Sequence, residues 1–405
     1  MLGVDQNMRP TTPIFTWADR RSATHAARLR SAPDAGQLHR ETGCPVHSSF
    51  WPARLLWLAE AEPAAYAATR FWLSAADYMY FRLFGTVTAS TSMASGTGLF
   101  DIGRLIWSER AIRAAKLDPA ALPDVSDAPC HGLRAEYAER WPQLRDVPWF
   151  PAKGDGACSN IGAGCADDGR MAFMLGTSGS MRIVWEAGKA AIADPGQWCY
   201  RVDRRRFAGG MALSEGGNAV AWARKSLLLG APAEIEANVV AMPPDGHGLT
   251  VLPFFLGARS PDWIDGRTAV FAGITAATSP LDMYRAVLES VAIRFALLKR
   301  RLDAARPGQR RVVATGAAFL QSSAWPQIVA DCLGEEIMLS GVSEGSLRGA
   351  AILALEELGC IASIGALESP ITAVVNPDAE AHAIYAKAME RHKRLDEQMI
   401  SMNVV

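Results

Sequence analysis

The sequence predicts an α/β protein with two domains. Its 405 residues are more than one ordinary hydrophobic core accommodates, so two domains are expected. Between residues 311 and 358 a strand, a turn of small residues, a helix, a second strand and a second helix follow one another, which is the order of an α/β unit. Strand-like segments separated by polar turns precede this unit at residues 171–208. We expect a ligand at the carboxyl end of the strand that begins at Arg311.

The first 150 residues are typical of short helices joined by loops. Residues 14–17 (Ile-Phe-Thr-Trp) form a strand-like run, and no strand is expected ahead of them. Asp19 can cap a helix that begins at Arg20. Ser74 is expected to cap a further helix, which stops at Gly85.

A polar turn at residues 166–169 (Ala-Asp-Asp-Gly) marks the expected boundary between the domains. We therefore expect a first domain at residues 1–165, a second at 166–365 and a helical tail at 366–405. The clearest helix of the second domain begins at Ser279, an N-cap followed by proline at the first helical position. Apolar residues then recur at three- and four-residue steps, as on the buried face of a helix.

Composition argues against several classes of protein. A net charge of −1 gives no reason to expect nucleic acid or an anionic membrane as a partner. No apolar run approaches the roughly 18 residues that a membrane span needs, and the first residues lack the pattern of a signal peptide. The seven cysteines are scattered and contain no Cys-x-x-Cys pair, which favours reduced thiols and neither a disulfide framework nor a zinc site. We expect a cytoplasmic protein with small-molecule partners.

The first motif that indicates chemistry surrounds Asp155. Gly154 and Gly156 flank this carboxylate where a run of small residues opens a helix. Because neither neighbour has a side chain, the carboxylate can approach a substrate hydroxyl closely. Aspartate at a helix start is also a common N-cap, and this simpler interpretation stays open.

The second motif is a break between two apolar strands. The break consists of small and hydroxylated residues, namely Gly176, Thr177, Ser178, Gly179 and Ser180. The N–H groups and hydroxyls of such a turn can bind an anion such as phosphate, although the same residues are common in ordinary hairpin turns. Together the two motifs indicate phosphoryl transfer from a nucleotide to an alcohol.

These residues resemble the FGGY family of carbohydrate kinases. Residues 269–274 (AVFAGI), and after seven residues the pair Asp282-Met283 followed by residues 286–289 (AVLE), match the family's C-terminal signature. The Asp155 loop is similar to the family's catalytic loop, and the Gly176 turn to its second phosphate-binding turn.

Two further stretches resemble the gluconate kinase branch of that family more than its xylulose or glycerol branches. They are residues 16–19 (TWAD) and residues 42–47 (TGCPVH). The resemblance to the family as a whole extends from about residue 10 to about residue 360.

The resemblance implies two RNase H-like domains, hinged around a cleft as in actin-like ATPases, with ATP and Mg²⁺ as cofactors. No residue of this sequence is assigned as a metal ligand, because the family's magnesium-ordering aspartate belongs to a loop that the sequence lacks. It implies that Asp155 is the general base for the attacking sugar hydroxyl. The residues implied in nucleotide binding are Thr315, Gly316, Ala317, Ala318 and Gln321. Those implied in sugar binding are Trp17, Asp19, Gly154, Asp155 and Arg259. A homo-oligomer is possible.

The sequence departs from the family pattern in three places. The family begins with a strand and an Asp-x-Gly-Thr phosphate loop, which this sequence lacks, so we expect the first domain to be incomplete at its N-terminus. Ala317 stands where the family usually has glycine, and Ala258 where glutamate is common.

The sequence leaves several functional hypotheses open. The first is an ATP-dependent kinase of a sugar or sugar acid, of the gluconate kinase type. The others are a xylulose kinase-like activity, or a catalytically impaired remnant that binds nucleotide or sugar without phosphoryl transfer. A misassigned start codon would also explain the missing loop.

Overall fold

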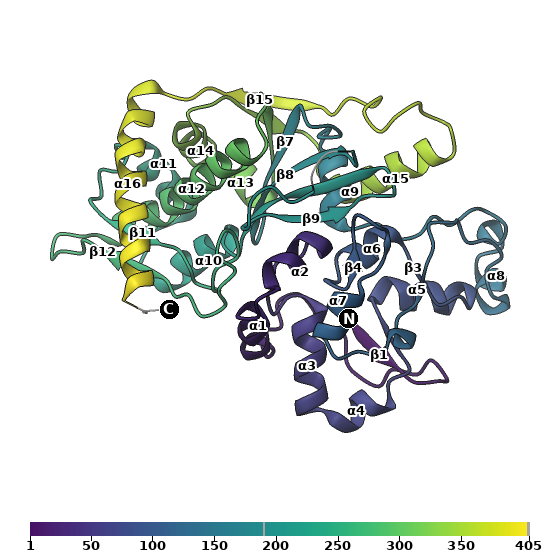
Figure 1. Ribbon diagram of the computed structural model, residues 1–405. Helices are drawn as coiled ribbons and strands as arrows, with labels where there is room; N and C mark the ends of the chain where they lie inside the picture. Colours follow the sequence, from purple (N-terminus) through teal and green to yellow (C-terminus); the bar gives the residue numbers. More distant parts are fainter. Residues whose placement is uncertain (189–190, 403–405) are drawn as a thin grey trace. The chain divides into compact units, whose positions relative to one another are not determined.

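The computed structural model describes residues 1–188 and 191–402, and its contacts divide the chain into two compact units (Figure 1). The first unit contains Met1–Cys158, Trp185–Gly209 and Leu353–Cys360, and the second contains Ser159–Val184, Gly210–Ile352 and Ile361–Val405. The chain thus passes from one unit to the other several times. The residues that the sequence suggested as a separate tail are assigned to the second unit.

Short helices dominate the first unit. They are α1 (Ala23–Arg30), α2 (Ala35–Thr42), α3 (Trp51–Ala61), α4 (Pro63–Ala68), α5 (Ala75–Phe84), α6 (Thr91–Ser95), α7 (Glu109–Ala114), α8 (Ala135–Arg140) and the 3-10 turns η1 (Pro119–Ala121) and η2 (Pro142–Leu144). The predicted cap of α5 is confirmed, because Ser74 forms a capping box with Asp77 and the helix ends at Gly85 in the left-handed conformation.

The strands of the first unit are short. They are β1 (Leu2–Val4), β2 (Phe71–Leu73), β3 (Thr88–Ala89), β4 (Phe100–Asp101), β5 (Ile106–Trp107), β6 (Asp124–Val125) and β9 (Trp198–Arg201). Two-stranded sheets join β1 to β2, β3 to β6 and β4 to β5. The expectation that no strand precedes residue 14 was therefore wrong, because β1 pairs antiparallel with β2.

Residues 14–17 do not form the predicted strand. Their backbone groups find partners outside a sheet, since Phe15 N–H donates to the Met1 carbonyl at 2.8 Å and Arg54 Nη2 donates to the Thr16 carbonyl at 2.9 Å. The predicted helix start at Arg20 was also wrong. Helix α1 begins at Ala23, and Asp19 instead accepts hydrogen bonds from the backbone and the guanidinium of Arg21.

The hydrophobic core of the first unit includes one face of α3. Trp51, Leu55 and Leu58 project from this helix and are buried together with Trp72 and Leu99. A full burial of one such side chain stabilises the fold by roughly 1.5–3 kcal/mol. A buried ion pair links two distant stretches of the same unit, where Arg206 bonds to both Asp203 and Glu356.

The largest sheet has seven strands in the order β15-β14-β13-β7-β8-β10-β9. Its strands other than β9 are β7 (Arg170–Leu175), β8 (Gly179–Glu186), β10 (Arg206–Leu213), β13 (Arg311–Thr315), β14 (Ile337–Ser340) and β15 (Ile371–Val375). Strand β13 is parallel to both β7 and β14, whereas β7 and β8 form an antiparallel pair. A separate antiparallel pair joins β11 (Thr250–Leu252) to β12 (Val270–Ala272).

Eight helices of the described chain begin after residue 150. They are α9 (Asp155–Gly162), α10 (Gly217–Ser226), α11 (Pro232–Ala241), α12 (Pro280–Ala305), α13 (Ala317–Gln321), α14 (Trp325–Leu333), α15 (Gly345–Glu357) and α16 (Ala379–Ser401). The predicted start of α12 is confirmed by a capping box between Ser279 and Asp282. Helix α16, yellow in Figure 1, contacts α12, α14 and β11. No helix in the described residues is long and apolar enough to cross a membrane.

Candidate active site

Asp155 is the first residue of α9, and its side chain is exposed. Its Oδ1 accepts a hydrogen bond of 2.7 Å from the N–H of Gly156. The Gly154 carbonyl accepts the first bond of the helix, at 3.1 Å from Cys158 N–H, so Gly154 rather than Asp155 stands at the N-cap position.

The residues before Asp155 are held by the segment that opens α6. Ser90 Oγ donates to the Ala152 carbonyl at 2.5 Å, and Gly154 N–H donates to Ser92 Oγ at 3.0 Å. Lys153 Nζ lies 3.8 Å from a carboxylate oxygen of Asp127. The backbone that leads into α9 is therefore fixed on both sides of Lys153.

The far end of α9 is held equally closely. The Gly162 carbonyl accepts from Arg348 Nη1 at 2.6 Å and from Ser369 Oγ at 3.0 Å. A Cβ atom at Gly162 would lie 1.8 Å from the Gly345 carbonyl oxygen, so only glycine fits at this crossing of α9 and α15. The helix that begins at Asp155 thus ends in a fixed position.

The Gly176 turn joins β7 to β8. Thr177 is exposed, Gly176 and Ser178 are half-buried, and Gly179 and Ser180 are buried as the first residues of β8. Gly176 N–H donates to the Ser178 carbonyl at 3.0 Å. Within the described residues, the N–H groups and hydroxyls of Thr177 and Ser178 have no protein partner, so an anion can accept from them.

Residues 216–218, at the start of α10, support this turn from behind. Gly217 N–H donates to the Gly176 carbonyl at 2.7 Å, and Asn218 N–H donates to the Thr177 carbonyl at 3.1 Å. A Cβ atom at Gly216 would lie 2.8 Å from the Gly176 carbonyl oxygen. The sequence interpretation missed this support, although the Gly-Gly pair before a helix was a visible signal for close backbone approach.

The carboxyl end of β13 lies beside the same turn. Thr315 of β13 is in register with Met174 of β7, and the next residue, Gly316, has a φ of +117°. A Cβ atom at Gly316 would lie 2.2 Å from the Leu175 carbonyl oxygen. The second unit therefore brings Thr315, Gly316 and the Gly176 turn together at the carboxyl ends of β13 and β7, as expected for parallel strands.

The remaining residues implied in nucleotide binding lie on α13. Ala317 and Gln321 are exposed on this short helix. The side chain of Ala318 lies outside the described residues.

Three residues implied in sugar binding have local partners. Trp17 is 52% exposed, and its carbonyl accepts from Ser49 Oγ. The hydrogen bond from Arg21 lowers the pKa of Asp19. Arg259 is half-buried in the second unit, where Glu215 lies within its electrostatic range. Burial raises the pKa of Glu215 to about 7, and its Oε1 accepts from Leu256 N–H at 3.2 Å.

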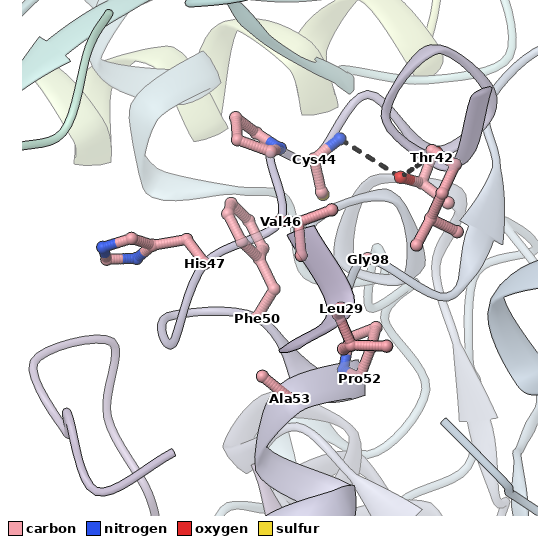
Figure 2. A pocket seen from close by; sticks show the side chains of 11 residues that line it. Leu29, Thr42, Cys44, Val46, His47, Phe50, Pro52, Ala53 and Gly98 are labelled. Atoms are coloured by element: carbon pink, nitrogen blue, oxygen red, sulfur yellow. Dashed lines mark hydrogen bonds between the residues drawn. The ribbon is translucent and has the colours of Figure 1, made fainter. Parts of the chain in front are cut away.

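The stretch that resembles the gluconate kinase branch, residues 42–47, lines a small cavity in the first unit (Figure 2). Cys44 N–H donates to Thr42 Oγ1 at 3.3 Å, and apolar side chains such as Phe50 close the cavity. His47 is buried and hydrogen-bonds to Ser49 through Nδ1. These contacts hold the loop of residues 42–47 in place.

One cluster of described residues has the spacing of a metal site but not its chemistry. Ligand atoms of Asp245, His247 and Glu289 lie within 4.8 Å of one another. His247 Nδ1 accepts from Leu249 N–H, so Nε2 carries the proton that it donates to Glu289 at 2.9 Å, and no ring lone pair remains for a metal. Arg285 and Arg391 already pair with Glu289 and Asp245. The cluster is a network of ion pairs and hydrogen bonds around the buried Glu289.

Comparison with known proteins identifies the class to which this fold and these motifs belong. Residues 1–162 match the N-terminal domain of the FGGY family of carbohydrate kinases, and residues 171–357 match its C-terminal domain. The chain belongs to this family, and it is a phosphotransferase with the family's two-domain, actin-like fold.

Individual relatives include kinases with different sugar substrates. A gluconokinase from Bacillus subtilis (strain 168) is 27% identical over 390 residues, which cover 92% of this chain and 75% of that protein. A xylulose kinase from Escherichia coli (strain K12) is 26% identical over 413 residues, covering 98% and 83%. The crystal structure of gluconate kinase from Lactobacillus acidophilus matches with a TM-score of 0.90 at 24% identity, over 98% of this chain and 82% of that one.

Proposed function

We propose that this carbohydrate kinase transfers the γ-phosphoryl group of ATP to a hydroxyl of a sugar acid, with gluconate as substrate and 6-phosphogluconate as product. The observation that carries the proposal is Asp155, an exposed carboxylate between two glycines at the first residue of a helix. The likeness to a gluconokinase and the match of residues 42–47 to that branch support gluconate over other sugars.

In this proposal Asp155 accepts the proton of the sugar hydroxyl while that oxygen attacks the γ-phosphorus in line. The glycines on either side leave room for the sugar to approach. The Thr177 and Ser178 N–H groups and hydroxyls then bind a phosphate of the nucleotide. Phosphoryl transfer depends mainly on such electrostatic stabilisation and positioning.

In this proposal ATP lies at the carboxyl ends of β7 and β13, where Gly176 and Gly316 carry no Cβ and the donors of Thr177 and Ser178 have no partner among the described residues. Mg²⁺ supplies charge neutralisation when it is bound, and it usually binds through substrate phosphates and one or two carboxylates. We assign it no protein ligand. The Asp245–His247–Glu289 cluster does not fit this ion, because its lone pairs and charges are already used.

The test is the activity of Asp155→Asn with ATP and gluconate. A general base typically contributes about 10²- to 10⁴-fold in rate, so kcat is expected to fall by that factor. Asp167→Asn is the matched control, since Asp167 is also an exposed aspartate that accepts from a nearby backbone N–H. Equal activity of Asp155→Asn and the control would rule out Asp155 as the general base.

A xylulose kinase activity is the second candidate, since a xylulose kinase matches the chain over a similar length. Comparing kcat/KM for gluconate and for xylulose at the same ATP concentration distinguishes the two candidate activities. A higher value for xylulose would replace gluconate by xylulose as the proposed substrate. Calorimetry that detects ATP binding without turnover of either sugar would instead favour an impaired kinase.

A further inference from the structure

We propose that Ser92 is a positioning residue for Asp155, holding the backbone immediately before the carboxylate in its reactive place. The inference rests on the proposed function, because it gives Ser92 a role only if Asp155 is the base. It concerns a residue that no feature of the sequence had singled out.

The contacts of Ser92 form a continuous connection between two distant segments of the first unit. Ser92 is 3% exposed, and its Oγ accepts from Gly154 N–H at 3.0 Å. The same oxygen donates its proton to the Arg201 carbonyl at 2.8 Å. One hydroxyl therefore ties the residue before Asp155 to strand β9.

Both bonds depend on the hydroxyl. A serine has one proton to give and lone pairs to accept, so accepting from Gly154 and donating to Arg201 fixes the orientation of both bonds. Loss of the oxygen would leave a half-buried N–H and a buried carbonyl without this partner, which destabilises the folded state. The Arg201 side chain is held as well, since its guanidinium donates to the Ile102 carbonyl and its Cζ lies 4.0 Å from the centroid of the Phe207 ring.

Gly154 is the position where such a bond matters most. Glycine has the greatest backbone freedom of all residues, and this one directly precedes the carboxylate. Its carbonyl is held by the first helical bond of α9, whereas its N–H is held by Ser92 alone among the described residues. Without Ser92 the peptide before Asp155 can rotate, and a displacement near 1 Å can cost about 10²-fold in rate.

Ser95 offers a matched control one helical turn away. It is also buried, and its Oγ donates to the Ser92 carbonyl at 2.7 Å and accepts from Arg201 N–H at 2.8 Å. Ser95 thus makes the same number of buried bonds to the same neighbourhood. The Ser95 carbonyl accepts from Cys44 Sγ at 3.4 Å, and among the described residues no hydrogen bond of Ser95 reaches residues 152–156.

The experiment compares Ser92→Ala with Ser95→Ala in the full chain, using steady-state kinetics with ATP and gluconate and thermal unfolding. Both variants are expected to lose similar stability. Only Ser92→Ala should lower kcat, by roughly 10- to 100-fold, with both KM values within about threefold of wild type. Ser92→Thr, which keeps the hydroxyl, should recover most of the lost kcat. If Ser92→Ala does not fold, Ser92→Cys replaces it, since a thiol preserves packing but bonds weakly.

Equal kcat values for the Ser92 and Ser95 variants, or a normal kcat in a folded Ser92→Ala or Ser92→Cys, would overturn the inference. Asp155→Asn distinguishes this failure from failure of the proposed function. If Asp155→Asn is inactive while the Ser92 variants are normal, only the positioning role is lost. If Asp155→Asn is fully active, the assignment of the base is lost, and the positioning role with it.

Discussion

Adding a single methyl group at Gly216 is expected to raise the KM for ATP, although this methyl group does not contact the nucleotide. A Cβ atom there would lie 2.8 Å from the Gly176 carbonyl oxygen and 2.9 Å from two backbone atoms of Ser178. Backbone atoms cannot move aside as a flexible side chain can, so the turn must shift. Overpacking of this kind costs about 1–3 kcal/mol, which corresponds to roughly 5- to 150-fold in an equilibrium constant. We expect Gly216→Ala to raise the KM for ATP by a factor in this range.

The assay is initial-rate kinetics with ATP varied at saturating gluconate, and then gluconate varied at saturating ATP. The KM for gluconate should stay within about twofold, because the displaced turn serves the nucleotide in our proposal. Gly36→Ala is the control, since a Cβ there meets Arg40 Nη1 at 3.5 Å, an ordinary contact. An ATP KM within twofold of wild type for Gly216→Ala would refute the view that this glycine supports the phosphate turn.

Two further predictions concern stability. Ser279→Ala removes the capping box of α12, so the free energy of unfolding in urea is expected to fall by about 0.5–2 kcal/mol; an unchanged value would contradict the role of the cap. Burial raises the pKa of Glu215 to about 7 from its ordinary 4.5, so the folded state binds more protons than the unfolded state between these values, and stability is expected to fall as pH rises from 4.5 to 7. Glu215→Gln should flatten this dependence in urea titrations at several pH values, and an unchanged slope would argue against it.

Elements with local signals could be predicted from the sequence. Helices α5 and α12 are capped by Ser74 and Ser279, whose hydroxyls bond to residues only three positions away. Such contacts depend on neighbouring residues alone, so spacing reveals them. The Asp155 and Gly176 motifs were recognisable for a similar reason, since each is a short run of small residues around chemically suited groups.

Features that depend on distant partners could not be predicted. Strand β1 exists because β2, about seventy residues later, pairs with it. The sequence of residues 14–17 is typical of a strand, yet the Thr16 carbonyl accepts a hydrogen bond from the Arg54 side chain and not from a neighbouring strand. The support of Gly176 by Gly217 and of Gly154 by Ser92 likewise joins segments about forty and sixty residues apart. Periodicity carries no information about such pairings.

The division of the chain into units limits how this kinase can be dissected. A recombinant fragment that stops at residue 165 contains most of the first unit but lacks Arg201, whose carbonyl accepts the hydrogen bond from Ser92, and both members of the Arg206–Glu356 pair. These three residues belong to the first unit but lie on the complementary C-terminal fragment. Cleavage near residue 165 therefore does not separate the two units from each other. The two fragments are better studied by co-expressing them.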